Sequence, residues 1–168
     1  HRNLKAKFIS KFEDSGRLFE FEDFGIQTKN HNRDDWSSNW HRIMTQKILP
    51  PPHINHSSKV EPKDLLNFRA FKKKLSLIDS KNNSLQIGGE DKAKKLLSSF
   101  LEKRMDGYSI KMSSPVEAEH SCSRLSPHIS FGTISLRTIF QEVQKSMNGS
   151  LFKKDLYSFK KRLHWHCH

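Results

Sequence analysis

The chain has 168 residues, enough for one domain with its own core, yet only 34% of them are hydrophobic, so the core is expected to be thin. The 30 Lys and Arg residues outnumber the 18 Asp and Glu residues and leave a net charge of +12, which favours a polyanionic partner such as nucleic acid but also suits a solvated surface or a membrane-facing patch. The two cysteines are read as free thiols, and the chain has neither an apolar run of bilayer length nor a secretion signal; a soluble protein of a reducing, cytoplasmic compartment is expected, without a disulfide framework or a membrane span.

The first 87 residues predict a helix, a strand and then a long connection. Leu4, Phe8 and Phe12 are spaced as on one face of a helix, and residues 18–22 alternate apolar and acidic side chains as a half-exposed strand does. Residues 26–87 contain three consecutive prolines and many Asn and Ser, with little sustained periodicity, so this stretch is expected to be a linker.

Two tryptophans of this linker, Trp36 and Trp40, are one helical turn apart. We expect them to clamp the linker onto a domain, because buried indole rings contribute a large apolar area. The alternative is that they stack on a ligand.

Three amphipathic helices are predicted after Gly88. The first follows Gly88-Gly89, the second is capped by Ser135 and closed by Gly149, and the third leads to the end of the chain. Their apolar stripes consist of Ala93, Leu96, Leu97, Phe100 and Leu101, of Leu136, Ile139, Phe140, Val143 and Met147, and of Phe152, Leu156, Phe159 and Leu163. The sequence therefore predicts a mainly α fold for this part, with lysine-rich outer surfaces.

A hydroxyl-rich loop lies between the first and second of these helices. It reads Ser121-Cys122-Ser123-Arg124-Leu125-Ser126-Pro127-His128 and is followed by Phe131-Gly132-Thr133-Ile134-Ser135. Serine hydroxyls and the backbone N–H groups that open a helix are donors suited to a pyrophosphate. The alternative is that these serines only form caps and turns.

This loop resembles the flavin-phosphate loop of photolyases and cryptochromes, and the resemblance continues on both sides. Its flanking motifs are Gly88-Gly89-Glu90, Tyr108, Pro115 and the helix that ends in Arg162-Leu163-His164-Trp165-His166, while residues 32–40 resemble an interdomain segment of certain bacterial photolyase-like proteins. The resemblance implies a remnant of an α/β domain at 1–25, an interdomain linker at 26–87 and the N-terminal half of a helical FAD-binding domain at 88–168. Since the chain starts at His1 and stops within an expected helix, we expect a fragment that is inactive alone.

The resemblance also implies which residues contact FAD. They are Tyr108, Cys122, Ser123, Arg124, Leu125, Ser126 and Phe159. Family members often carry a hydroxyl residue where this chain has Cys122. Because a thiol is a poor hydrogen-bonding group, Cys122 is expected to offer the cofactor only its backbone N–H. Arg124 also fits a structural ion pair, and Phe159 also fits the apolar stripe of its helix.

A second implied set contacts DNA. Its members are Lys160, Lys161, Arg162, Trp165 and His166. Trp165 matches a tryptophan that lines the cavity for a flipped-out pyrimidine dimer. Arg162 replaces a glutamate that contacts the dimer in the best-known repair enzymes, which disfavours repair of that class and suits a phosphate, a different lesion or a light receptor.

The expected function is thus FAD-dependent, light-driven electron transfer to a DNA lesion, or photoreception, by an intact, monomeric parent protein. The chain lacks the later family segments with the electron-transfer tryptophans. The alternative is a basic helical nucleic-acid-binding module without a cofactor. His164, His166 and His168 are two residues apart on a helix and cannot converge on a metal ion, so no metal is expected.

Overall fold

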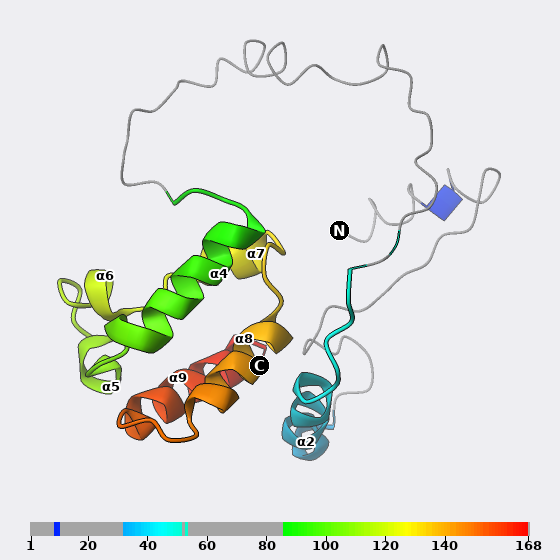
Figure 1. Cartoon of the computed structure of the whole chain (residues 1–168). Helices are drawn as coiled ribbons and strands as arrows, with labels where there is room; N and C mark the ends of the chain where they lie inside the picture. The colour runs from blue at the N-terminus through cyan, green and yellow to red at the C-terminus, as the bar shows by residue number, and fades with distance from the viewer. Residues whose placement is uncertain (1–8, 11–31, 52, 54–85, 168) are drawn as a thin grey trace, which may run out of the picture.

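The computed structural model describes residues 9–10, 32–51, 53 and 86–167. The predicted strand at 18–22 and all but residues 9 and 10 of the predicted helix around residues 4–12 lie outside these residues. Within the described residues the fold is helical and contains no strand (Figure 1). The elements are α2 (Arg33–Met44), α4 (Glu90–Ser99), η2 (Phe100–Arg104), α5 (Tyr108–Lys111), α6 (Ala118–Ser121), α7 (Ser126–Ser130), α8 (Leu136–Ser146) and α9 (Lys153–His166).

The three amphipathic helices after Gly88 are confirmed as α4, α8 and α9, which together make a mainly α unit. Helix α8 begins where predicted, since the Ser135 side chain accepts a hydrogen bond from the N–H of Thr138 at 3.0 Å. It is closed by Gly149, whose φ of +81° lies in the left-handed region that glycine adopts without strain. Helices α8 and α9 then run side by side (Figure 1).

Ser135→Ala should lower the free energy of unfolding by about 1 kcal/mol, because it removes the N-cap acceptor of α8. Urea unfolding followed by circular dichroism measures this change. Ser130→Ala is a matched control, because Ser130 is an exposed serine of α7. Equal stability of the two variants would contradict the capping role.

The predicted linker contains helix α2, which packs onto α8 and α9. Trp36 and Trp40 are buried, with the Trp40 ring 5.3 Å from Phe140 and the Trp36 ring 4.4 Å from His164. The Oγ of Ser37 also lies 3.2 Å from Nε2 of His164. These contacts confirm that the two tryptophans clamp this part of the chain onto the helical unit.

The core lies between the longer helices, each of which contributes buried side chains to it. Its fully buried large side chains include Phe100, Phe140, Ile139 and Leu156, and Trp40 extends the same cluster onto α2. Because α2 contributes buried aromatic rings, it adds apolar burial to a unit whose sequence is poor in hydrophobic residues.

Helix α4 continues into a π-helical turn, η2. The N–H of Met105 bonds to the carbonyl of Phe100 at 3.0 Å, five residues earlier. Such turns carry one extra residue and often occur at functional sites. Here the turn ends on Arg104, whose contacts define the candidate site described below.

A buried carboxylate joins α5 to α9. Asp155 accepts hydrogen bonds from the backbone N–H groups of Ser109 at 2.7 Å and Gly107 at 3.2 Å. Burial by itself would raise the pKa of Asp155, but these bonds outweigh burial, and the pKa lies below its usual range. Asp155 thereby fixes the position of Tyr108 beside α9.

Candidate functional site

Arg104 ties the predicted phosphate loop to the end of α4. Its guanidinium donates hydrogen bonds to the carbonyls of Cys122 and Ser123, the second at 3.4 Å. It also donates to the carbonyl of Leu96 at 2.8 Å and to the hydroxyl of Ser99 at 3.2 Å. The position of the loop therefore depends on one side chain that the sequence did not single out.

These bonds decide which way the loop amides point. In a trans peptide the C=O and the following N–H point in opposite directions. Because the carbonyls of Cys122 and Ser123 face Arg104, the N–H groups of Ser123 and Arg124 face away from it. Arg124 has a left-handed φ of 58° and is followed by Leu125 in the right-handed helical region, a succession that forms anion-binding nests.

The serines of the loop have different roles. Ser121 is buried and donates its hydroxyl to the carbonyl of Glu117 at 2.7 Å, so its role is structural. Ser123 is half-buried and accepts a long, 3.4 Å bond from the N–H of Leu125. Ser126 is exposed, and its hydroxyl bonds to no other described residue. Leu125 itself is buried in the core, so only its backbone can serve a ligand.

The helix expected after the loop is short. Helix α7 has five residues and carries Pro127 in its first turn, where proline offers no N–H. The donors of this loop are therefore the amides before the helix and the hydroxyls of Ser123 and Ser126.

Tyr108 and Phe159 lie against each other, with ring centroids 5.6 Å apart. Both are buried, and the Phe159 ring also lies 4.7 Å from the Phe100 ring. Core packing alone therefore accounts for the position of Phe159. Burial, reinforced by Cys122 and opposed by Arg162, raises the pKa of Tyr108 to about 12, and the phenol stays neutral.

Cys122 and Arg124 have local partners as well. Burial raises the pKa of the Cys122 thiol, although Arg104 and Arg162 oppose the change, so the thiol stays protonated at neutral pH. Arg124 pairs with Glu119 at 3.5 Å in a partly exposed ion pair, which agrees with the structural alternative for this arginine. Both burial and Arg124 lower the pKa of Arg104.

The residues predicted to bind DNA point in different directions from α9. Lys160 donates to the side chain of Gln144 at 2.7 Å and lies over the Phe140 ring, so it faces α8. Arg162 comes seven residues, or two turns, after Asp155 and therefore lies on the side that faces α5 and the loop. Lys161, Trp165 and His166 are exposed.

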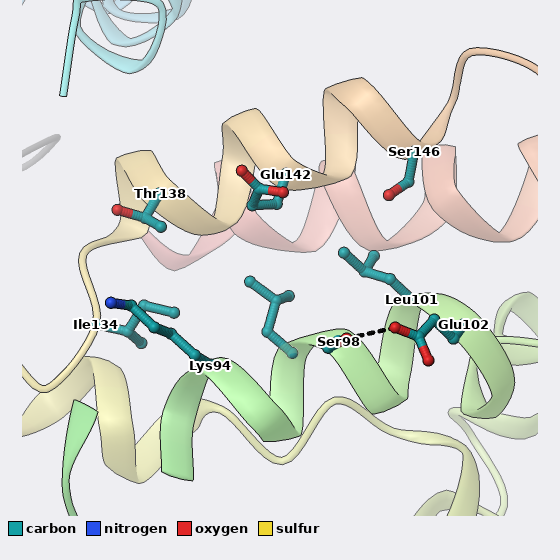
Figure 2. Close-up of a pocket in the computed structure, with 9 residues that line it drawn as sticks. Lys94, Ser98, Leu101, Glu102, Ile134, Thr138, Glu142 and Ser146 are labelled. Atoms are coloured by element: carbon teal, nitrogen blue, oxygen red, sulfur yellow. Dashed lines mark hydrogen bonds between the residues drawn. The ribbon is translucent and has the colours of Figure 1, made fainter. Parts of the chain in front are cut away.

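A separate groove of about 410 Å³ lies between α4 and α8. Figure 2 shows Lys94, Ile134 and Thr138 at one end and Leu101, Glu102 and Ser146 at the other. None of the residues that line the groove belongs to the predicted FAD or DNA sets.

Comparisons with protein-family models, curated proteins and solved structures gave no match. Among the described residues, no three His, Cys, Asp or Glu side chains are grouped to hold a metal ion. None of the described helices is suited to crossing a lipid bilayer. A function is therefore assigned from the arrangement of the loop, Tyr108 and α9.

Proposed function

We propose that residues 88–168 are the N-terminal half of the helical domain of a photolyase- or cryptochrome-type flavoprotein, preceded by its interdomain linker, and that residues 122–126 hold the pyrophosphate of FAD. One observation carries the proposal. Three segments chosen from sequence motifs, namely Tyr108, the loop and the Phe159–Arg162 part of α9, are neighbours in the fold, although up to 54 positions separate Tyr108 from Arg162 in the sequence.

The chemistry of the loop suits a phosphorylated ligand. The N–H groups of Ser123 and Arg124 face away from the Arg104 guanidinium, which engages the carbonyls on the other side. Arg124 and Arg162 add positive charge near these donors, and a charged acceptor such as phosphate strengthens each hydrogen bond. The Ser123 and Ser126 hydroxyls complete the donor set.

In the intact protein this site would serve light-dependent chemistry on DNA or light sensing. FAD, when bound, supplies light-driven electron transfer, and the residues named above hold its phosphates. The resemblance implies that Trp165 stacks on a base, and its exposure is compatible with this role. Arg162 faces the loop, which supports a phosphate-binding role in place of the lesion-contacting glutamate of the common repair enzymes.

FAD titration followed by fluorescence anisotropy tests the phosphate site. The Ser123→Ala/Ser126→Ala variant should bind FAD about 10-fold more weakly than the unchanged chain, because two hydroxyl donors to a charged ligand are lost. Ser130→Ala, just outside the loop, should bind normally. Equal binding by the double variant would show that FAD binds elsewhere. If neither this chain nor a version extended beyond His168 binds FAD, the proposal that the protein is a flavoprotein is refuted.

A second candidate is a basic nucleic-acid-binding module without a cofactor. The net charge of +12 and the exposed lysines of α9 favour it. It predicts salt-sensitive DNA binding that is unchanged in the Ser123→Ala/Ser126→Ala variant, whereas the flavin proposal requires these serines for FAD retention.

A further inference from the structure

The outer face of α9 carries alternating lysines and aromatic rings. At 100° per residue, Lys154, Tyr157, Lys161 and Trp165 fall within an arc of about 80°. The buried residues of the helix, including Leu156 and Leu163, lie on the opposite side. We call the four outer residues the α9 stripe.

The aromatic members of the α9 stripe are unusually exposed. The exposed fractions of Tyr157 and Trp165 are 52% and 71%. The ammonium of Lys161 lies 4.7 Å from the centre of the Tyr157 ring, so cation and ring form one continuous surface. Helix α9 has a single acidic residue, Asp155, and it is buried against α5, so the only charged members of the stripe are its two lysines.

The spacing of the stripe matches an extended nucleic-acid strand. Successive members are three or four residues apart, which is about 5 to 6 Å along a helix axis, and the stripe spans about 17 Å. Phosphates of a strand can meet the ammonium groups while its bases stack on the rings. Bases of a duplex are already paired and stacked, so they cannot reach Tyr157 without being unstacked.

We propose that the α9 stripe is a binding surface for single-stranded nucleic acid. The inference does not depend on flavin binding, because Lys154 and Tyr157 have no part in the proposed FAD site. It differs from the set predicted from sequence, since it adds these two residues and leaves out Lys160, Arg162 and His166. The ammonium of Lys160 is bonded to Gln144 on the α8 side.

Binding of a fluorescein-labelled oligothymidine, measured by anisotropy at two salt concentrations, tests the stripe. Tyr157→Ala should weaken binding about 10-fold, and Tyr157→Phe should bind within about 2-fold of the unchanged chain because the stacking ring remains. Lys154→Gln/Lys161→Gln should weaken binding and lower the salt slope by about 1 to 2. A labelled duplex of equal length should bind more weakly than the single strand.

Two controls separate this surface from general charge and from the flavin site. Lys160→Gln removes the same charge from the α8 side of the helix and should change the affinity less than about 2-fold. The Ser123→Ala/Ser126→Ala variant should bind the oligonucleotide normally. The proposal is overturned if the duplex binds as tightly as the single strand, or if Tyr157→Ala, shown by circular dichroism to be folded, binds like the unchanged chain.

Discussion

Arg104→Ala should lower the free energy of unfolding by about 3 kcal/mol, one of the two largest effects expected in this chain. The substitution leaves the carbonyls of Leu96, Cys122 and Ser123 without their charged donor in a partly buried region. Each bond to a charged group is worth roughly 1.5 to 3 kcal/mol, and exposure of the loop to water offsets part of the loss. Urea unfolding followed by circular dichroism measures the change.

Two variants show whether the arginine acts through the loop. Lys103→Ala removes an exposed cation of the same π-helical turn and should leave stability nearly unchanged. Arg104→Lys keeps the charge but cannot reach carbonyls on both segments at once, so an intermediate stability is expected. If the phosphate site lies on this loop, Arg104→Ala should also lose FAD at temperatures where it is still folded. Normal stability of Arg104→Ala would show that the loop is held by other contacts.

Asp155→Ala should cost a similar amount, about 3 kcal/mol, near neutral pH. It leaves the N–H groups of Gly107 and Ser109 without their acceptor at the junction of α5 and α9. Asp106→Ala is the matched control, because Asp106 directly precedes Gly107 and its carboxylate is exposed. Thermal or urea unfolding of both variants gives the comparison.

The contribution of Asp155 should depend on pH in one direction. Its pKa in the folded protein is lower than the ordinary value of 3.8, so the unfolded chain binds the proton more readily. The stabilisation is therefore complete above about pH 5 and is lost as the pH falls below 3.8 through the folded-state pKa. The stability difference between the unchanged chain and Asp155→Ala should shrink on acidification; a constant difference down to pH 3 would contradict this assignment.

The long helices could be predicted because their apolar stripes and caps are local signals. Ser135 caps α8, and Gly149 closes it as the sequence indicated. Helix α2 could have been predicted from Trp36, Trp40 and Met44, which repeat every four residues and are all buried. The sequence instead predicts a linker there, because the polar composition around α2 outweighs three apolar positions.

The geometry of the candidate site was less predictable, because its decisive contacts join distant positions. Arg104 reaches residues 18 and 19 positions away, and Asp155 caps a turn 46 positions before it in the sequence. Periodicity reports which face of a helix is apolar, and it does not report which polar side chain meets which loop. The left-handed Arg124 was equally hidden, because glycine is the usual signal for that conformation.

The π-helical turn makes chain length as important as composition between α4 and α5. The apolar series Ala93, Leu97, Phe100 continues with Met105, five residues on, so the extra residue keeps both halves of the series in the core. Deleting one residue within η2 would restore the ordinary pitch and leave Met105 four residues after Phe100, on the same face, whereas inserting one more residue would rotate the following segment by about 100° relative to α4. After such an insertion Arg104 would leave the loop and Met105 would leave the core, although every side-chain type was still present. This segment should therefore tolerate conservative replacements far better than insertions.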